Sequence, residues 1–328
     1  MTQSQQAAWM SPTAVATGLT ATPDPDAVGA PASGFFPTEP KDLAATGLSE
    51  SDVEHLLLKR LLYQGPATSR ETALGLHLPR PLILEAFERL RAELLTSIRG
   101  SAGLEDFTFQ LTEAGHDRAR RLAAQCTYCG VAPVPLESYL ESVAGQSLCS
   151  TRLTLADLER AMGELRLSSR LLSQLGQAVG DGRGLFLYGP PGNGKTTVSE
   201  RLVESFGETI WIPHTITIDG ELVRLFDPRC HEPVPDAADA PGRADRRWVQ
   251  IHRPTLVVGG ELTMDELDLQ FNQQTGICEA PVQMRANCGA LVVDVAGARE
   301  RDDYARHGPG RSAAQSRRRA GGGIARRD

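Results

Sequence analysis

The chain has 328 residues, of which 41% are hydrophobic and 23% are charged, and its formal net charge is −7. This composition is typical of a globular protein with room for two or three domains, and the acidic balance argues against broad nucleic-acid binding. No apolar run approaches the roughly 18–20 residues of a membrane-spanning helix, and the N-terminus lacks a signal-peptide pattern. We therefore expect a cytoplasmic protein with no membrane partner.

Residues 1–47 are rich in Ala, Thr, Ser, Pro and Gly and show neither helical nor strand periodicity. Such a segment has too few apolar side chains to build a core, so we expect a largely disordered tail with order beginning at Leu48. The pair Phe35-Phe36 within it has two interpretations. It either docks onto a folded domain or is a stray aromatic pair.

Residues 48–125 have the pattern of three helices followed by a hairpin. Thr68-Ser-Arg-Glu71 has the form of a capping box that opens the second helix, and Arg80-Pro81 begins the third. Alternating residues at 107–111 follow a Gly/Ser turn, as expected of a hairpin. The first helix carries an apolar stripe of Val53, Leu56, Leu57 and Leu61. This α+β arrangement resembles a winged-helix domain.

Winged-helix domains often bind DNA, but residues 51–125 contain ten basic and ten acidic side chains. Because DNA affinity depends strongly on contacts between basic side chains and phosphates, a balanced charge favours docking to a protein partner. DNA binding and a purely structural role remain as alternatives.

Residues 126–182 are interpreted as a linker and a helical connector. Gly130–Pro135 is predicted to be the linker, and helical patterns follow at 136–145, 155–164 and 169–179. Cys126-Thr-Tyr-Cys129 is a single C-x-x-C without a second pair at zinc-site spacing. Ordinary free thiols, a zinc site and a redox pair all fit this motif.

A nucleotide-binding loop follows a short apolar strand at 184–188 and precedes a helical pattern. Glycines let backbone N–H groups turn toward phosphate oxygens, and the start of the helix adds the positive end of its dipole. Lysine at this position reaches the terminal phosphates, and the hydroxyl after it can bind Mg²⁺. The loop fits G-x-x-x-x-G-K-[ST], and its candidate residues are Gly189, Pro190, Pro191, Gly192, Asn193, Gly194, Lys195, Thr196 and Thr197.

Residues 183–294 are predicted to form the nucleotide-binding domain, with a β-rich insertion at 215–258. Strand patterns lie at 209–212, 215–218, 221–225, 248–251 and 255–258, and Asp219-Gly220 is a strong hairpin signal. Cys230-His231 lies in a polar stretch and is interpreted as part of a loop and not as a metal site. Thr263-Met-Asp-Glu266 has the form of another capping box.

The segment Ala286-Asn-Cys-Gly-Ala-Leu-Val-Val-Asp294 is an apolar strand that ends in an acid. This is the pattern of a Walker B motif, whose carboxylate holds Mg²⁺ opposite the hydroxyl of the phosphate loop. Thr196 and Asp294 are therefore the predicted Mg²⁺ ligands, and ATP is the predicted nucleotide.

The combination of GPPGNGKTT with A-N-x-G-x-L-x-x-D about 90 residues later resembles bacterial AAA+ ATPases near the MoxR-like and chelatase groups. The resemblance covers roughly residues 48–294 and includes the version with an N-terminal winged helix, often labelled a predicted ATPase with chaperone activity. It implies an α/β P-loop fold, chaperone-like ATP-driven remodelling of a protein partner, and assembly into homo-oligomers.

The sequence departs from this family at three points. Val295 follows Asp294 where the family has a second acid, Cys288 replaces a usual Gly, and no sensor or arginine finger is found at a matching position. We therefore expect ATP binding with poor or absent hydrolysis. The alternative is a non-enzymatic winged-helix regulator or adaptor, bound to DNA or protein, whose conformation is set by nucleotide.

Residues 295–328 contain nine Arg and few large apolar side chains. Three interpretations compete: a change of reading frame after the Walker B strand, a basic disordered tail, and divergent folded sequence.

Overall fold

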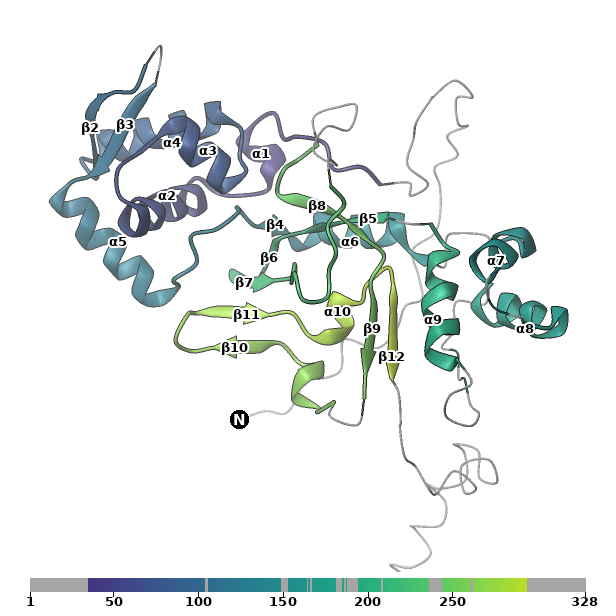
Figure 1. Cartoon of the computed structure of the whole chain (residues 1–328). Coiled ribbons are helices and arrows are strands. Elements are labelled where there is room, and N and C mark those ends of the chain that lie inside the picture. The colour runs from purple at the N-terminus through teal and green to yellow at the C-terminus, as the bar shows by residue number, and fades with distance from the viewer. Residues whose placement is uncertain are drawn as a thin grey trace, which may run out of the picture. The chain divides into compact units, whose positions relative to one another are not determined.

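The computed structural model describes residues 35–103, 106–148, 153–163, 165, 167–180, 185, 187, 194–207, 209–235, 244–259 and 262–293. Within these residues the protein is a mixed α/β structure with several small sheets, one of which has five strands (Figure 1). No helix in the described part of the chain is long and apolar enough to cross a membrane.

Four helices and a three-stranded sheet account for most of residues 50–125. The sequence predicts the helices and a two-stranded hairpin, and the strand Ala67–Thr68 is an addition to that hairpin. The sheet has the order β1-β3-β2, and both of its pairings are antiparallel. The elements are α2 (Glu50–Gln64), β1 (Ala67–Thr68), α3 (Ser69–Leu76), α4 (Arg80–Ala92), β2 (Thr96–Ser101), β3 (Phe107–Leu111) and α5 (Glu113–Gln125).

Local sequence signals explain where these helices begin. The capping box predicted at Thr68 and Glu71 is present, because each side chain bonds the backbone N–H of the other residue. Pro81 occupies the first turn of α4, where its missing N–H costs no helical hydrogen bond. The helices enclose an apolar core in which the rings of Phe87 and Phe109 stack with centroids 4.0 Å apart.

The expectation of a disordered tail through residue 47 is wrong for residues 35–47. A short helix, α1 (Leu43–Thr46), is capped by the Asp42 side chain. The docking interpretation of the aromatic pair is confirmed, since Phe35 packs on Trp248 and Phe36 on Trp211, with ring centroids 5.1 and 5.8 Å apart. Composition alone missed this order because the apolar partners lie about 170–210 residues further along the chain.

The five-stranded sheet has the order β10-β11-β7-β6-β4. The hairpin between β6 and β7 turns at Asp219 and Gly220, whose φ values of 50° and 84° match the predicted tight turn. β4 pairs with β6 and β11 with β7 in parallel, and the other neighbours are antiparallel. The strands are β4 (Val134–Pro135), β6 (Thr215–Ile218), β7 (Glu221–Arg224), β10 (Gln270–Asn272) and β11 (Ile277–Glu279).

The interpretation of Gly130–Pro135 as a linker is wrong at its second half. Val134 is fully buried, and it pairs with Ile216 at the edge of the five-stranded sheet. The prolines around it suggested an unpaired segment, but an edge strand needs hydrogen bonds on one side only.

Two further sheets have two strands each: β5 with β8 are antiparallel and β9 with β12 are parallel. The predicted strands at 209–212, 248–251 and 255–258 and the strand before residue 294 are thereby confirmed. The remaining elements are α6 (Leu136–Gln146), α7 (Leu155–Ala161), α8 (Ser169–Gly180), α9 (Lys195–Glu204), β5 (Thr209–Pro213), β8 (Trp248–His252), β9 (Thr255–Val258), η3 (Asp265–Leu267), α10 (Val282–Arg285) and β12 (Ala290–Val293).

Candidate functional site

The predicted phosphate-binding loop is described only at its C-terminal end. Gly189, Pro190, Pro191, Gly192 and Asn193 lie outside the described residues, as do most of the predicted strand at 184–188 and Asp294. Of the candidate residues, Gly194, Lys195, Thr196 and Thr197 have a described structure.

Helix α9 begins at Lys195, directly after the last glycine of the motif. Gly194 is the N-cap residue, with φ 70° and ψ 23°, a left-handed conformation that side-chain-bearing residues rarely adopt. No described atom lies within 4 Å of a Cβ added at Gly194. The helix therefore starts without a capping side chain, as expected where backbone N–H groups of the first turn bind an anion.

One face of α9 is buried, and this packing anchors the helix to the core. Val198, Leu202 and Val203 are at most 9% exposed, and the first two belong to a core shared with α7 and α8. Lys195 and Thr196 are half-buried, whereas Thr197 is exposed. The two residues assigned to phosphate and Mg²⁺ thus lie at the start of a helix that is anchored by its own later turns.

The strand that precedes Asp294 packs against this helix. β12 is paired in parallel with β9, in the register Val293↔Val258, and α9 contacts both strands. In Figure 1, α9 and β12 run in opposite directions, so the helix begins toward the side on which the strand ends. The structure therefore brings Lys195 and Thr196 toward the end of the strand that leads to Asp294.

The turn before β12 explains most of the A-N-x-G pattern. The Asn287 side chain donates a hydrogen bond to the Tyr139 hydroxyl at 2.7 Å. A Cβ on Gly289 would lie 2.0 Å from the carbonyl oxygen of Pro254, so only glycine fits there. Sequence reasoning treated this segment as a strand signal and missed these supporting contacts, because Tyr139 and Pro254 are distant in sequence.

Cys288 lies at the tightest point of this turn. Its φ of 60° is in the left-handed region, which explains why glycine suits this position better. Its thiol contacts the carbonyl oxygen of Val143, and its own carbonyl oxygen accepts a hydrogen bond from Arg253. Burial raises the pKa of Cys288 to about 11, against a smaller opposing effect of the Arg253 charge. This thiol is therefore protonated at neutral pH.

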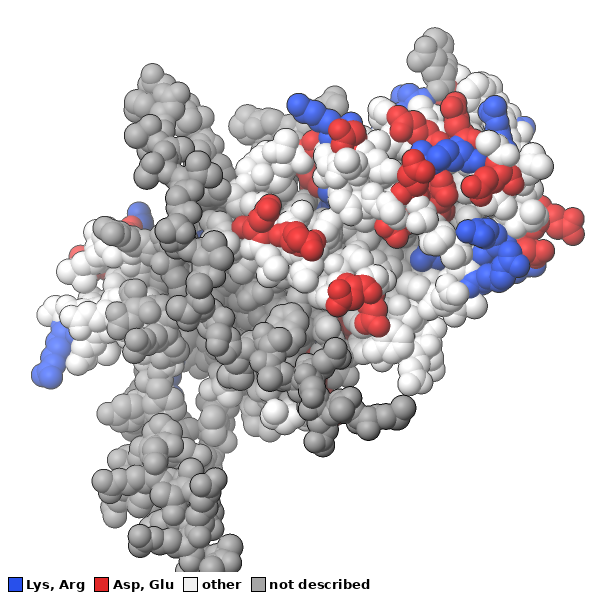
Figure 2. All heavy atoms as spheres, turned by 180° about the vertical axis from the view of Figure 1, so that it is seen from behind, with Lys and Arg blue, Asp and Glu red and all other residues white. Residues whose placement is uncertain are grey.

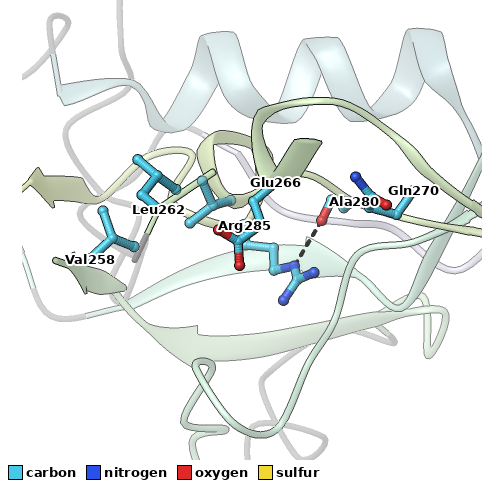
Figure 3. Close-up of a pocket in the computed structure, with 7 residues that line it drawn as sticks. Val258, Leu262, Glu266, Gln270, Ala280 and Arg285 are labelled. Atoms are coloured by element: carbon cyan, nitrogen blue, oxygen red, sulfur yellow. Dashed lines mark hydrogen bonds between the residues drawn. The ribbon is translucent and has the colours of Figure 1, made fainter. Parts of the chain in front are cut away.

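A cavity of about 180 Å³ lies beside the end of β9, between Val258, η3 and α10 (Figure 3). Its charged groups already have structural partners. Arg285 donates hydrogen bonds to the carbonyl oxygen of Ala280 and to Asp227, and Glu266 accepts one from the backbone N–H of Thr263. The cavity thus has apolar lining residues, and its charged side chains hold the surrounding loops in place.

The other sequence candidates have structural contacts. His231 accepts a hydrogen bond from the backbone N–H of Asp227, and its second ring nitrogen bonds the carbonyl oxygen of Arg285. Cys126, Cys129 and Cys230 are free thiols. Among the described residues, no group of three or more His, Cys, Asp or Glu side chains could hold a metal ion.

Comparison of the chain with protein-family models finds no match, and comparison with curated proteins finds none either.

Proposed function

We propose that this protein is an AAA+-type ATP-binding protein of the MoxR-like and chelatase-like group, with an N-terminal winged-helix domain. The observation that carries the proposal is the relation between the two motifs. Helix α9, which begins at Lys195 with Gly194 as its N-cap, packs on a strand that ends one residue before Asp294. Binding of Mg²⁺-ATP requires the two motifs to lie close together, because residues of both motifs bind the same Mg²⁺ ion.

The residues at the start of α9 suit a phosphate group. Gly194 leaves the helix N-terminus without a capping side chain, and the N-terminal turn of a helix favours an anion. In the proposed assignment Gly189, Gly192, Asn193 and Gly194 cradle the phosphates, Lys195 neutralises their charge, and Thr196 and Asp294 hold Mg²⁺. Bound Mg²⁺-ATP would supply an activated phosphoanhydride.

We propose that hydrolysis is slow in this chain. Val295 occupies the position at which a second carboxylate would orient the attacking water. By resemblance to the family, nucleotide binding serves chaperone-like remodelling of a protein partner by a homo-oligomer, in the cytoplasm.

A protein-binding role for the winged-helix part is favoured by its charge distribution. Arg80 pairs with Asp106, and Arg89 pairs with Glu50 and Glu54, so these α4 cations already have acidic neighbours. Where Figure 2 shows described residues, basic and acidic side chains are interspersed, and these residues form no continuous basic surface on that face. This favours a protein partner over DNA phosphates.

The test is ATP binding to the full chain by isothermal titration calorimetry, with and without Mg²⁺. We expect saturable binding that Lys195→Ala weakens at least tenfold, whereas Lys41→Ala, at an exposed lysine, leaves it unchanged. Absence of binding, or equal binding by the two variants, would refute the proposal.

Two further assays separate the enzymatic and non-enzymatic alternatives. Phosphate release of order one per second, abolished by Lys195→Ala, would contradict slow hydrolysis. Retarded migration of duplex DNA that weakens with added salt would favour the DNA-binding regulator.

A further inference from the structure

Strands β5 and β8 form an antiparallel ribbon whose two faces differ. Because side chains alternate along a strand, the register Pro213↔Trp248 and Trp211↔Gln250 places both tryptophans on one face. The opposite face, which includes Ile210, packs into an apolar core shared with the five-stranded sheet. The two tryptophans therefore need a separate apolar cover.

The aromatic pair near the N-terminus provides this cover. Phe35 packs on Trp248 and Phe36 on Trp211, and with these rings in place both tryptophans are at most 6% exposed. Helix α6 leaves room for the first ring, because a Cβ on Gly145 would lie 3.1 Å from the Cβ of Phe35. The pair therefore occupies a defined site on the ribbon.

Residues 35–38, here called the strap, are also held through their backbone. The backbone N–H of Asp245 donates to the carbonyl oxygen of Pro37 at 2.9 Å, and Thr38 forms an antiparallel bridge with Ala244. Proline has no N–H, so the buried Pro37 leaves no backbone donor unpaired. An extended segment of two aromatic residues followed by proline thus matches this surface.

The strap fits the surface incompletely. A cavity of about 460 Å³ has both tryptophans in its lining, together with His77, His214 and Val249. The indole N–H of Trp211 is buried, and among the described residues it has no hydrogen-bond acceptor. A buried donor without a partner costs free energy. A longer segment that carries an acceptor would therefore fit this face better than the strap does.

We propose that the outer face of β5 and β8 is a docking surface for an extended segment of a protein partner, in which two adjacent aromatic residues precede a proline. In the free chain the strap occupies this surface, and the partner displaces it. The strap competes strongly because a tethered segment has a high effective concentration. The surface uses none of the residues assigned to ATP.

The test measures binding of a fluorescent peptide with the sequence of residues 33–40 to the full chain by fluorescence anisotropy. The variant Phe35→Ser/Phe36→Ser, whose strap no longer competes, should bind this peptide at least tenfold more tightly than the parent chain. The same peptide with both phenylalanines replaced by serine is the control and should not bind. Equal affinities of variant and parent, or binding of the control peptide, would overturn the proposal.

A substitution in α6 tests where the peptide binds. Adding Gly145→Leu to the double variant should weaken peptide binding at least tenfold, because the new side chain occupies the space taken by Phe35. Ala144→Leu, at an exposed position of the same helix, is the matched control and should leave binding unchanged. Equal binding by the two chains would place the peptide elsewhere and contradict the proposal.

A locked strap provides the test if the double variant does not fold. Thr38 and Ala244 face each other in an antiparallel bridge, where Cα atoms lie about 4.5–5.5 Å apart, a distance that a disulfide can span. Thr38→Cys/Ala244→Cys should therefore lose peptide binding on oxidation and regain it on reduction. Binding that oxidation leaves unchanged would overturn the proposal.

The oligomeric state distinguishes a partner protein from a second copy of this chain. Light scattering of the parent chain is measured with and without the peptide. We expect peptide binding to leave the molar mass of the protein assembly unchanged. An oligomer that the peptide dissociates would show that strap segments are exchanged between copies, and it would overturn the assignment to a partner protein.

Discussion

The Asn287 side chain donates a 2.7 Å hydrogen bond to the hydroxyl of Tyr139, which joins the turn before β12 to helix α6. Tyr139 is 3% exposed, and burial raises its pKa to about 12, with the bond from Asn287 acting in the opposite direction. An asparagine of the A-N-x-G pattern thus serves to hold the strand that leads to Asp294.

Replacing Asn287 with Ala should destabilise the protein by roughly 1–3 kcal/mol, because the buried Tyr139 hydroxyl loses its partner. Tyr139→Phe should cost about 1 kcal/mol, and the double variant should cost clearly less than the sum. Urea unfolding of the four chains measures the coupling. Strict additivity would show that the hydrogen bond contributes nothing.

Cys288→Gly should be more stable than Cys288→Ala by about 1 kcal/mol, because an alanine keeps the unfavourable left-handed backbone that glycine adopts freely. Both variants lose the same thiol contact with Val143, so their difference isolates the backbone effect. Chemical unfolding at neutral pH gives the comparison. An alanine variant equal to or more stable than the glycine variant would disprove it.

His214 should make the protein acid-sensitive. Burial lowers its pKa to about 4, and the neighbouring His77 adds to this effect. The folded-state pKa is below the unfolded value, so the stabilisation is present above pH 6.5 and is lost as the pH falls through about 4.

His214→Phe should remove on the order of 1–2 kcal/mol of pH-dependent change in the free energy of unfolding over this range, after allowance for solvent screening. His252→Gln, at an exposed histidine, is the matched control. Unfolding curves at pH 7, 5.5 and 4 provide the measurement, and an unchanged slope in His214→Phe would be the contrary result.

Phe36→Ala should destabilise the protein by about 2 kcal/mol, because the half-buried ring packs edge-on against the buried Trp211. Phe271→Ala removes the same ring from a side chain that is 57% exposed and should cost less than about 0.5 kcal/mol. Limited proteolysis around residue 40 should also speed up in Phe36→Ala alone. Equal losses in both variants would argue against docking of residues 35–47.

Local signals in the sequence were sufficient to predict most helices and hairpins. The capping box at Thr68, the tight turn at Asp219-Gly220 and the helix after Gly194 depend on residues within a few positions of each other. The phosphate-loop pattern also depends only on neighbouring residues, and the nucleotide that its residue types and spacing indicate stays a prediction.

Only the tertiary structure decided which distant segments meet. Val134 becomes an edge strand because Ile216 lies beside it, and Phe36 is ordered because Trp211 offers an apolar surface. The packing of α9 on β12, which carries the functional proposal, is also a long-range contact. Such contacts depend on the free energy gained when surfaces far apart in the chain are buried together. Hydrophobic periodicity and helix-capping residues are local patterns, so they do not identify which surfaces pack against each other.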